Sequence, residues 1–358
     1  MRIGPRRMLA GAVALAVAGA TGAEVARIGA VVLDAETRRP LAGVEMKGHF
    51  ALDNGWQAWK GGASPNLVTV RTDGDGRCTA SARTNKGVAG WHVMSVPEGY
   101  YRPAHGGWFT FERKGLLGNW APDNLVSTVL VQRVRRPIPL VAKVLRTRNA
   151  RLPPLAADGG MAGRLAYDLV RGDWLPPAGR GETADVEFVR RPVRGPEPDR
   201  RDVAMRFPGE GNGIVEMHVP DYAVPQIRTA PENGYGAELA FSGFFDKDGQ
   251  VVRQEYAGRN FCFRIRTRRD AEGRLVGGFY GKVYGGIAFT DATDPETGAH
   301  EFLSVPRMGY FLNPAPLDRN LEWDRRTVLV WSAGAGRLEP APATGGTYPC
   351  RGLIGPEP

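Results

Sequence analysis

The sequence has little histidine and little cysteine, and their spacing offers no familiar metal or nucleophile site. The five histidines are dispersed, without an H-E-x-x-H motif or a close pair. The sequence also lacks a G-x-S-x-G elbow, a P-loop and a dinucleotide fingerprint. The three cysteines are far apart, which argues against a cysteine-based metal centre. We therefore expect no metal and no cofactor.

Long apolar runs are absent beyond the N-terminus, so no later segment is expected to span a membrane. Residues 1–23 have the form of a signal peptide. Arg2, Arg6 and Arg7 precede an apolar run, and small residues end it at Ala23, where cleavage is expected. Arg6-Arg7 leaves twin-arginine export open beside the ordinary Sec route. We expect a periplasmic or extracellular protein.

Lysine is scarce, and arginine supplies nearly all of the positive charge. The formal net charge is +9, to which the signal peptide contributes three arginines. The remaining arginines are scattered through predicted strands and turns with acidic residues beside them. A nucleic-acid surface would instead gather basic residues with aromatics between them. The pattern predicts a mildly basic, solvated surface and no nucleic-acid partner.

Helical periodicity is almost missing, while short alternating runs bounded by Gly, Pro, Asn and Asp recur throughout. A brief stretch over 159–169 is the best helix candidate. The sequence predicts an all-β fold, with an N-terminal Greek-key β-sandwich over 24–135 and a second antiparallel β-rich domain with little helix over 136–338. Residues 339–358 are expected to form an extended Pro/Gly-rich tail.

The sandwich is predicted from seven short strands, expected near 26–33, 42–50, 67–71, 77–83, 91–96, 107–112 and 125–134. The run Asp73-Gly74-Asp75-Gly76 joins two of them and could be a calcium loop or a tight turn. A calcium loop of the EF-hand type would need a liganding Glu downstream, which is absent. The sequence therefore favours a turn.

A family resemblance rests on these motifs. The pattern Gly29-x-Val31-x-x-Asp34, Pro40-Leu41-Ala42-Gly43-Val44 and Thr72-Asp73-x-Asp75-Gly76-Arg77 resembles the carboxypeptidase regulatory-like domain, a prealbumin-type β-sandwich. Segments of the second domain resemble secreted bacterial proteins that pair this module with an uncharacterised β-rich domain, namely 137–140, 172–177, 263–267, 280–285 and 310–322. The resemblance implies architecture and export, and no chemistry.

Intradiol dioxygenases share a related sandwich, and the run Tyr100-Tyr101 to His105 is similar to part of their iron site. Their His-x-His pair would require a second histidine at position 107, where this chain has glycine. Losing one of four ligands would cripple such an iron site. We therefore do not expect an iron enzyme.

Trp56 and Trp59 lie in a Gly-rich, polar loop at one end of the predicted sandwich. Flat aromatics in such a loop can stack on sugar rings, and they can equally fold back and cap the core. Trp108, Trp120 and Trp174 are expected to pack in the core or between domains.

These features favour a secreted, non-catalytic protein that acts in surface interaction or ligand binding, with a polysaccharide or cell-surface component as partner. The alternative is a hydrolase of cell-wall or polysaccharide material that uses carboxylates of the second domain. Its candidate catalytic residues are Asp318 and Glu322, with Asp324 nearby. The same segment could instead be a buried structural knot, in which Asp318 or Asn320 satisfies backbone groups.

In an oxidising compartment the three cysteines cannot all pair. Cys78 is expected to be a small buried hydrophobic residue, and a Cys262–Cys350 disulfide would tie down the tail. Thiol titration of the denatured, unreduced protein should therefore give one thiol per chain. Three thiols would exclude the disulfide.

Overall fold

The computed structural model describes residues 24–52, 66–103, 106–113, 120–145, 152, 163–192, 200–218, 227–254, 256–293, 298 and 300–341. Within these ranges the chain is all β, as the alternating pattern predicts, and no helix is long and apolar enough to cross a membrane. The helix considered over 159–169 is wrong for its described part. Strand β12 (Arg164–Asp168) lies there instead, paired with a neighbouring strand.

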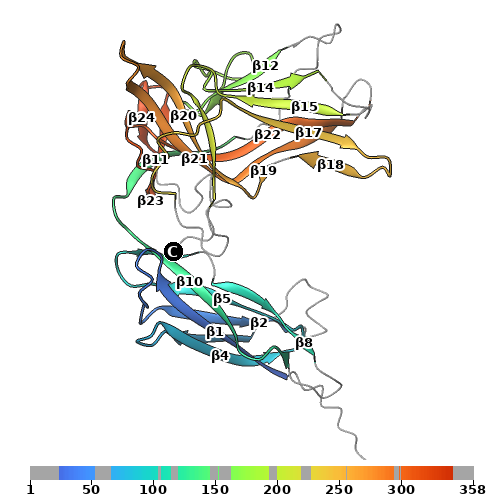
Figure 1. Ribbon diagram of the computed structural model, residues 1–358, viewed down its shortest axis with the longest axis vertical. Helices are drawn as coiled ribbons and strands as arrows, with labels where there is room; N and C mark the ends of the chain where they lie inside the picture. Colours follow the sequence, from blue (N-terminus) through green and yellow to red (C-terminus); the bar gives the residue numbers. More distant parts are fainter. Residues whose placement is uncertain are drawn as a thin grey trace, which may run out of the picture.

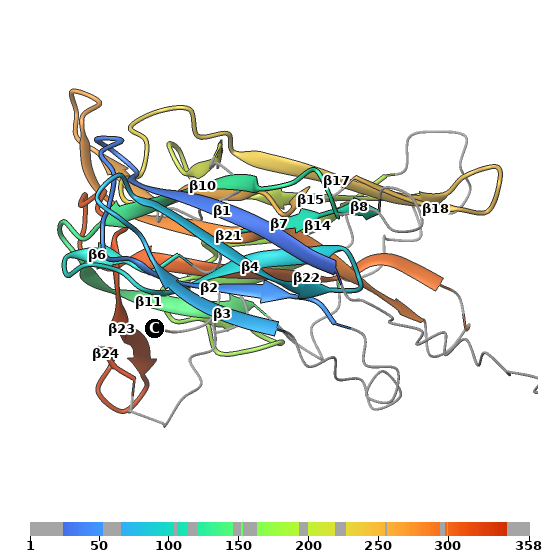
Figure 2. The ribbon, with the colours of Figure 1, turned by 90° about the horizontal axis from the view of Figure 1, so that it is seen from below.

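Two β domains are stacked along the long axis of the molecule (Figure 1). The first is a sandwich of two four-stranded sheets, and it lies in front in the view from below of Figure 2. One sheet has the order β4-β1-β10-β6, with bounds Arg77–Thr84, Glu24–Asp34, Leu125–Arg133 and Tyr100–Tyr101. The other has the order β3-β2-β5-β7, with bounds Asn66–Arg71, Glu45–Phe50, Val88–Ser95 and Gly107–Thr110. A small ribbon of β8 (Glu112–Arg113) and β9 (Trp120–Ala121) completes the domain.

Alternating burial along the strands shows which side chains form the core of the sandwich. In β2 every second side chain is buried, and Met46 and Phe50 point inward with Trp91 from β5. The indole Nε1–H of Trp91 donates a hydrogen bond of 3.0 Å to the carbonyl oxygen of Gly29 on the opposite sheet. Cys78 is buried in this core, as expected.

Two pairings depart from the antiparallel expectation, β1 with β10 in the first domain and β11 (Ile138–Leu145) with β23 (Trp323–Ser332) in the second. Strands β1 and β10 run parallel, in register from Ile28↔Leu125 to Asp34↔Val131. Parallel neighbours need a long crossover, and here the intervening strands of both sheets supply it.

The second domain also has two sheets (Figure 1). The larger has the order β16-β20-β21-β22-β11-β23-β24, with β19 pairing β21, and bounds Gly213–Met217, Asn260–Arg269, Leu275–Thr293, His300–Asn313, Ile138–Leu145, Trp323–Ser332, Arg337–Pro340 and, for β19, Tyr256–Ala257. The smaller has the order β13-β12-β14-β15-β17-β18, with the remaining bounds Asp173–Trp174, Val186–Arg191, Arg201–Arg206, Glu238–Phe245 and Val251–Gln254.

The larger sheet is covered on both faces. One face packs against the smaller sheet through Phe263 and Tyr310, which meet Phe188 and Phe241 in one buried cluster. The other face carries a second buried cluster that includes Phe311 and is closed by two chain segments at 227–230 and 319–323. Burial on both faces explains why its strands lack clean alternation.

Gly281 on β21 illustrates how tightly this core is packed. A Cβ at position 281 would fall well inside van der Waals contact of the Phe263 ring on the adjacent strand. Phe263 is fully buried and has no room to withdraw.

Replacing Gly281 by alanine should therefore lower the free energy of unfolding by about 1–3 kcal/mol, the usual penalty of overpacking a core. Denaturant unfolding of the purified variant measures it. Gly74→Ala is the matched control, because a methyl group at that position would have nothing within 4 Å of it. Equal stabilities of the two variants would contradict the packing argument.

Candidate functional site

The open face of the sheet β3-β2-β5-β7 carries a row of residues from four adjacent strands. Leu67 pairs with His49, His49 with Gly90, and Gly90 with Trp108. Because side chains alternate along a strand, these four positions face the same side, away from the sandwich core. We call Lys47, His49, Gly90, His92 and Trp108 the Trp108 platform.

Trp108 is 52% exposed, so the expectation that it packs in the core or between domains is wrong. Its ring lies over Gly90, where an added Cβ would come within 2.5 Å of the ring atom Cε3. A residue with a side chain at position 90 would push the indole off the sheet. Glycine thus lets a large aromatic ring lie on the sheet with much of its surface in water.

Two histidines surround the indole. The ring centroids of His49 and His92 lie 5.5 and 5.6 Å from that of Trp108, with edge-on geometries of 63° and 90°. The two imidazoles are 5.8 Å apart. Burial, and then the charge of His92, lowers the pKa of His49.

The platform is bordered by charged and polar side chains. Lys47 lies directly across from His92 on one side and from Thr69 on the other. In the next row Glu45 forms an ion pair of 2.6 Å with Arg71. A stacking ring with hydrogen-bond donors around it is suited to binding a flat, hydroxylated ligand.

The other tryptophans are placed differently. Trp174 is buried and Trp120 packs partly buried against the sandwich core, as expected. Trp56 and Trp59 lie outside the described residues, so their role in a ligand site stays a prediction. The sequence alone missed the platform, although the alternating run Gly107-Trp108-Phe109-Thr110 was a signal that Trp108 and Phe109 face opposite sides.

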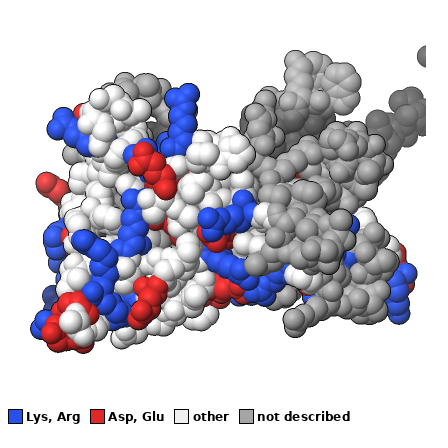
Figure 3. Space-filling view, turned by 90° about the horizontal axis from the view of Figure 1, so that it is seen from above, with Lys and Arg blue, Asp and Glu red and all other residues white. Residues whose placement is uncertain are grey.

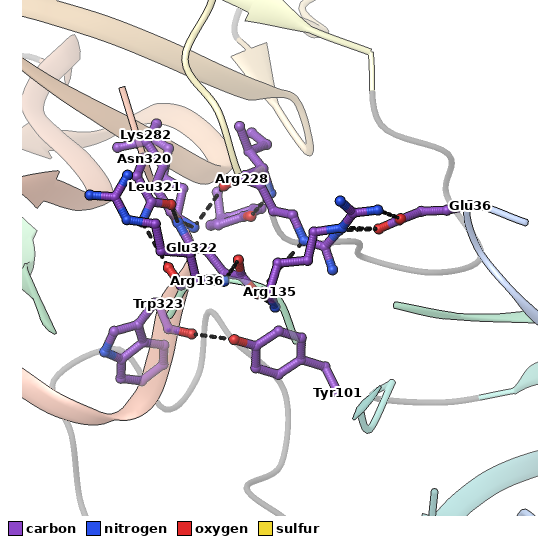
Figure 4. A network of polar contacts seen from close by, with 12 residues as sticks. Glu36, Tyr101, Arg135, Arg136, Arg228, Lys282, Asn320, Leu321, Glu322 and Trp323 are labelled. Carbon is purple, nitrogen blue, oxygen red and sulfur yellow. Dashed lines mark hydrogen bonds and ion pairs between the residues drawn. The ribbon is translucent and has the colours of Figure 1, made fainter. Parts of the chain in front are cut away.

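The carboxylates proposed for catalysis lie together beside the junction of the two domains, where Figure 4 shows Glu322. Glu322 is 1% exposed, and its two carboxylate oxygens accept hydrogen bonds of 2.8 Å from the backbone N–H groups of Arg135 and Arg136. The Nε of Arg228 lies 3.8 Å from the same carboxylate. Both oxygens are therefore engaged by the chain that links the domains.

Asp318 is also engaged. Its carboxylate accepts the N–H of Asn320 at 3.0 Å and pairs with Arg136 at 3.1 Å. Asn320 in turn accepts the N–H of Glu322 and donates to the carbonyl oxygen of Arg136. The segment forms a chain of local hydrogen bonds, the arrangement weighed above as a structural knot.

A pocket of about 340 Å³ opens beside these residues and is lined by Arg135, Arg136, Arg228, Thr229, Asp318, Arg319, Asn320 and Glu322. Each of its four arginines has an acidic partner. Glu36 pairs with both Arg135 and Arg228, and Glu232 pairs with Arg319. Together with Asp318 and Glu322, these carboxylates balance the arginines.

Further contacts link the domains at the same place (Figure 4). The Tyr101 hydroxyl donates to the carbonyl oxygen of Trp323 at 3.3 Å. Behind it, the buried Lys282 ammonium donates to the carbonyl oxygens of Ile227 and Leu321. These bonds hold the two segments that close the second domain against its larger sheet.

The described residues contain no group of three or more His, Cys, Asp or Glu side chains that could hold a metal ion. Tyr100 donates its hydroxyl to Asp34, and His105 lies outside the described residues. The Asp73 carboxylate accepts the N–H groups of Asp75 and Arg77, so the run interpreted as a turn is one.

Cys262 is fully buried, and burial raises the pKa of its thiol, when reduced, to about 12. Cys350 lies outside the described residues, so the disulfide stays a prediction. On the face shown in Figure 3, described basic and acidic side chains are interspersed rather than gathered by sign.

No protein-family model matches the sequence, and no curated protein does. Solved structures with some likeness are pilins. The C-terminal domain of the shaft pilin SpaA from Lactobacillus rhamnosus GG is 16% identical over 30% of this chain and 98% of its own, with a TM-score of 0.21. BcpA, the major pilin subunit of Bacillus cereus, is 10% identical over 80% of this chain and 95% of its own, with a TM-score of 0.21. The likeness at these scores does not bear on function. The carboxypeptidase regulatory-like assignment stays a prediction, although the all-β sandwich fits it.

Glu322→Ala should destabilise the junction strongly, because it leaves the partly buried N–H groups of Arg135 and Arg136 without their acceptor and removes the carboxylate beside Arg228. We expect a loss of about 3–5 kcal/mol in the free energy of unfolding of the second domain. Chemical denaturation monitored by tryptophan fluorescence measures it.

Asp318→Asn is the control at the same junction. Its ion pair with Arg136 is largely exposed, so its loss should cost about 0.2–1 kcal/mol. If Glu322→Ala cost no more than this control, Glu322 would not hold the junction.

Proposed function

We propose that this chain is an exported, non-catalytic protein that binds a glycan through the Trp108 platform. The observation that carries the proposal is the exposed indole lying over Gly90 on the open face of the sheet. Tryptophan is enriched at binding interfaces relative to the rest of the protein surface. Export rests on the predicted signal peptide.

The geometry suits a sugar ring. A pyranose presents a face of C–H groups that packs against an indole, and its hydroxyl groups project around the rim. Around Trp108 the rim is polar, with His49 and His92 edge-on to the ring and Lys47 beside them. Each imidazole can donate or accept a hydrogen bond from a hydroxyl group.

The contacts at the domain junction favour the non-catalytic interpretation over the hydrolase. A general acid or nucleophile must reach the substrate, but both oxygens of Glu322 are bound by backbone N–H groups in a buried position. Asp318 accepts a backbone bond and pairs with an arginine. Both residues are better explained by the joint between the domains.

The Trp56–Trp59 segment extends the proposal. It leaves from the end of β2 and returns at the start of β3, beside the His49–Leu67 pair of the platform. We propose that these tryptophans add ring surface to the same glycan site.

Trp108→Ala should weaken binding of the mature chain to its glycan about twofold to twelvefold, because an aromatic contact of this kind contributes about 0.5–1.5 kcal/mol. A polysaccharide panel followed by affinity electrophoresis on the positive members measures it. Val126→Ala is the control, since Val126 is 50% exposed on the other sheet. Trp56→Ala and Trp59→Ala test the extension.

Unchanged affinity of a folded Trp108→Ala variant would contradict the proposal that the Trp108 platform binds the glycan. Absence of binding to any panel member would overturn glycan binding itself. Turnover of a polysaccharide that Glu322→Gln abolishes in a folded protein would favour the hydrolase instead.

A further inference from the structure

We infer that the glycan taken by the Trp108 platform is acidic, with a carboxylate on the stacked sugar held by Lys47 and the two histidines. This inference rests on the proposed function and names the class of ligand. It is drawn from the positive charge that the side chains around the indole carry or can carry.

Three basic side chains meet on this part of the face. Lys47 and His92 are direct cross-strand partners, and His49 follows Lys47 on the same face of β2. Among the described residues no carboxylate pairs with Lys47. The nearest acidic group in the cross-strand rows, Glu45, is already paired with Arg71.

When the imidazoles are protonated, these three side chains bring positive charges together on neighbouring strands. Like charges on neighbouring strands destabilise a sheet. The pKa of His49 is lowered, first by burial and then by the nearby His92. A bound carboxylate would reverse this repulsion, because it stabilises the imidazolium forms and the Lys47 ammonium together.

Distances on the platform match one sugar residue. Both imidazole centroids lie within 5.6 Å of the indole centroid, so a ring stacked on Trp108 carries its substituents above the histidines. Lys47 is one strand spacing, about 4.8 Å, from His92. The pocket at the domain junction, by contrast, has its four arginines balanced by carboxylates.

The sign of the pH dependence follows. The groups facing His49 are Lys47 on its own strand, His92 on β5 and Trp108 on β7, with the Glu45–Arg71 pair one row further away, beyond Lys47. A carboxylate ligand raises the imidazole pKa on binding, so binding takes up protons. Affinity should therefore rise as the pH falls through the histidine range, while the carboxylate, with a pKa of about 3.5, stays ionised.

The test compares polygalacturonate with its fully methyl-esterified form, which has the same backbone without the charge. We expect the mature chain to bind the acidic form more tightly, and the difference to grow from about pH 8 to about pH 5.5. Lys47→Gln should weaken binding of the acidic form about twofold to fivefold and leave the ester unchanged. His49→Gln with His92→Gln should remove the pH dependence.

Arg27→Gln is the matched control, since it removes one positive charge from an exposed position on the other sheet. Equal binding of the acidic and esterified forms, or equal losses in Lys47→Gln and Arg27→Gln, would overturn the inference. So would failure to bind either form. These outcomes leave the proposed function to be decided separately, by neutral polysaccharides and Trp108→Ala.

Discussion

A buried carboxylate, that of Glu322, is at the centre of the contacts that hold the two domains together. Glu322 comes from near the end of the chain, and its oxygens bind the backbone N–H groups of Arg135 and Arg136, where the chain passes from the first domain to the second. Burying a charge is costly unless its bonds are satisfied, and here two backbone donors and the nearby Arg228 share that role. Glu36 extends the joint into the first domain by pairing with Arg135 and Arg228. The orientation of the sandwich, and with it the direction in which the Trp108 platform faces, depends on this joint.

The two regions that collect charged residues therefore differ in kind. At the joint, acidic and basic side chains form ion pairs and hydrogen bonds with one another inside the protein. On the open sheet face, Lys47 lies across from His92, one of the two imidazoles next to the exposed Trp108 ring, and has no carboxylate partner among the described residues. Ion-paired side chains stabilise the structure. A charged side chain without a carboxylate partner, close to an exposed aromatic ring, can instead bind a ligand. This contrast separates the residues best explained by architecture from those proposed for binding.

Much of the fold could be predicted from local pattern. Alternation in the segments that form β2 and β4, and turn chemistry at Asp73, indicated strand positions because both effects act over a few residues. The parallel pairing of β1 with β10 could not be predicted, since no local signal separates it from an antiparallel one. The platform was missed because it depends on Gly90 facing Trp108 from another strand, which only the register reveals. Likewise, Glu322 was a candidate acid in sequence, but its partners lie far away along the chain.

The strand order also constrains when each domain can form during synthesis. The first strand of the sandwich pairs with β10, one of its last strands, so the sheet is incomplete until residues 125–133 have emerged. In the second domain, β11 is first in sequence yet lies between β22 and β23, near the end of the described chain. Such long-range pairing is slow and leaves early strands unpaired meanwhile. The first domain can therefore fold while the second is still being synthesised. Glu322 is synthesised late, so it forms its bonds at the junction after the first domain has folded.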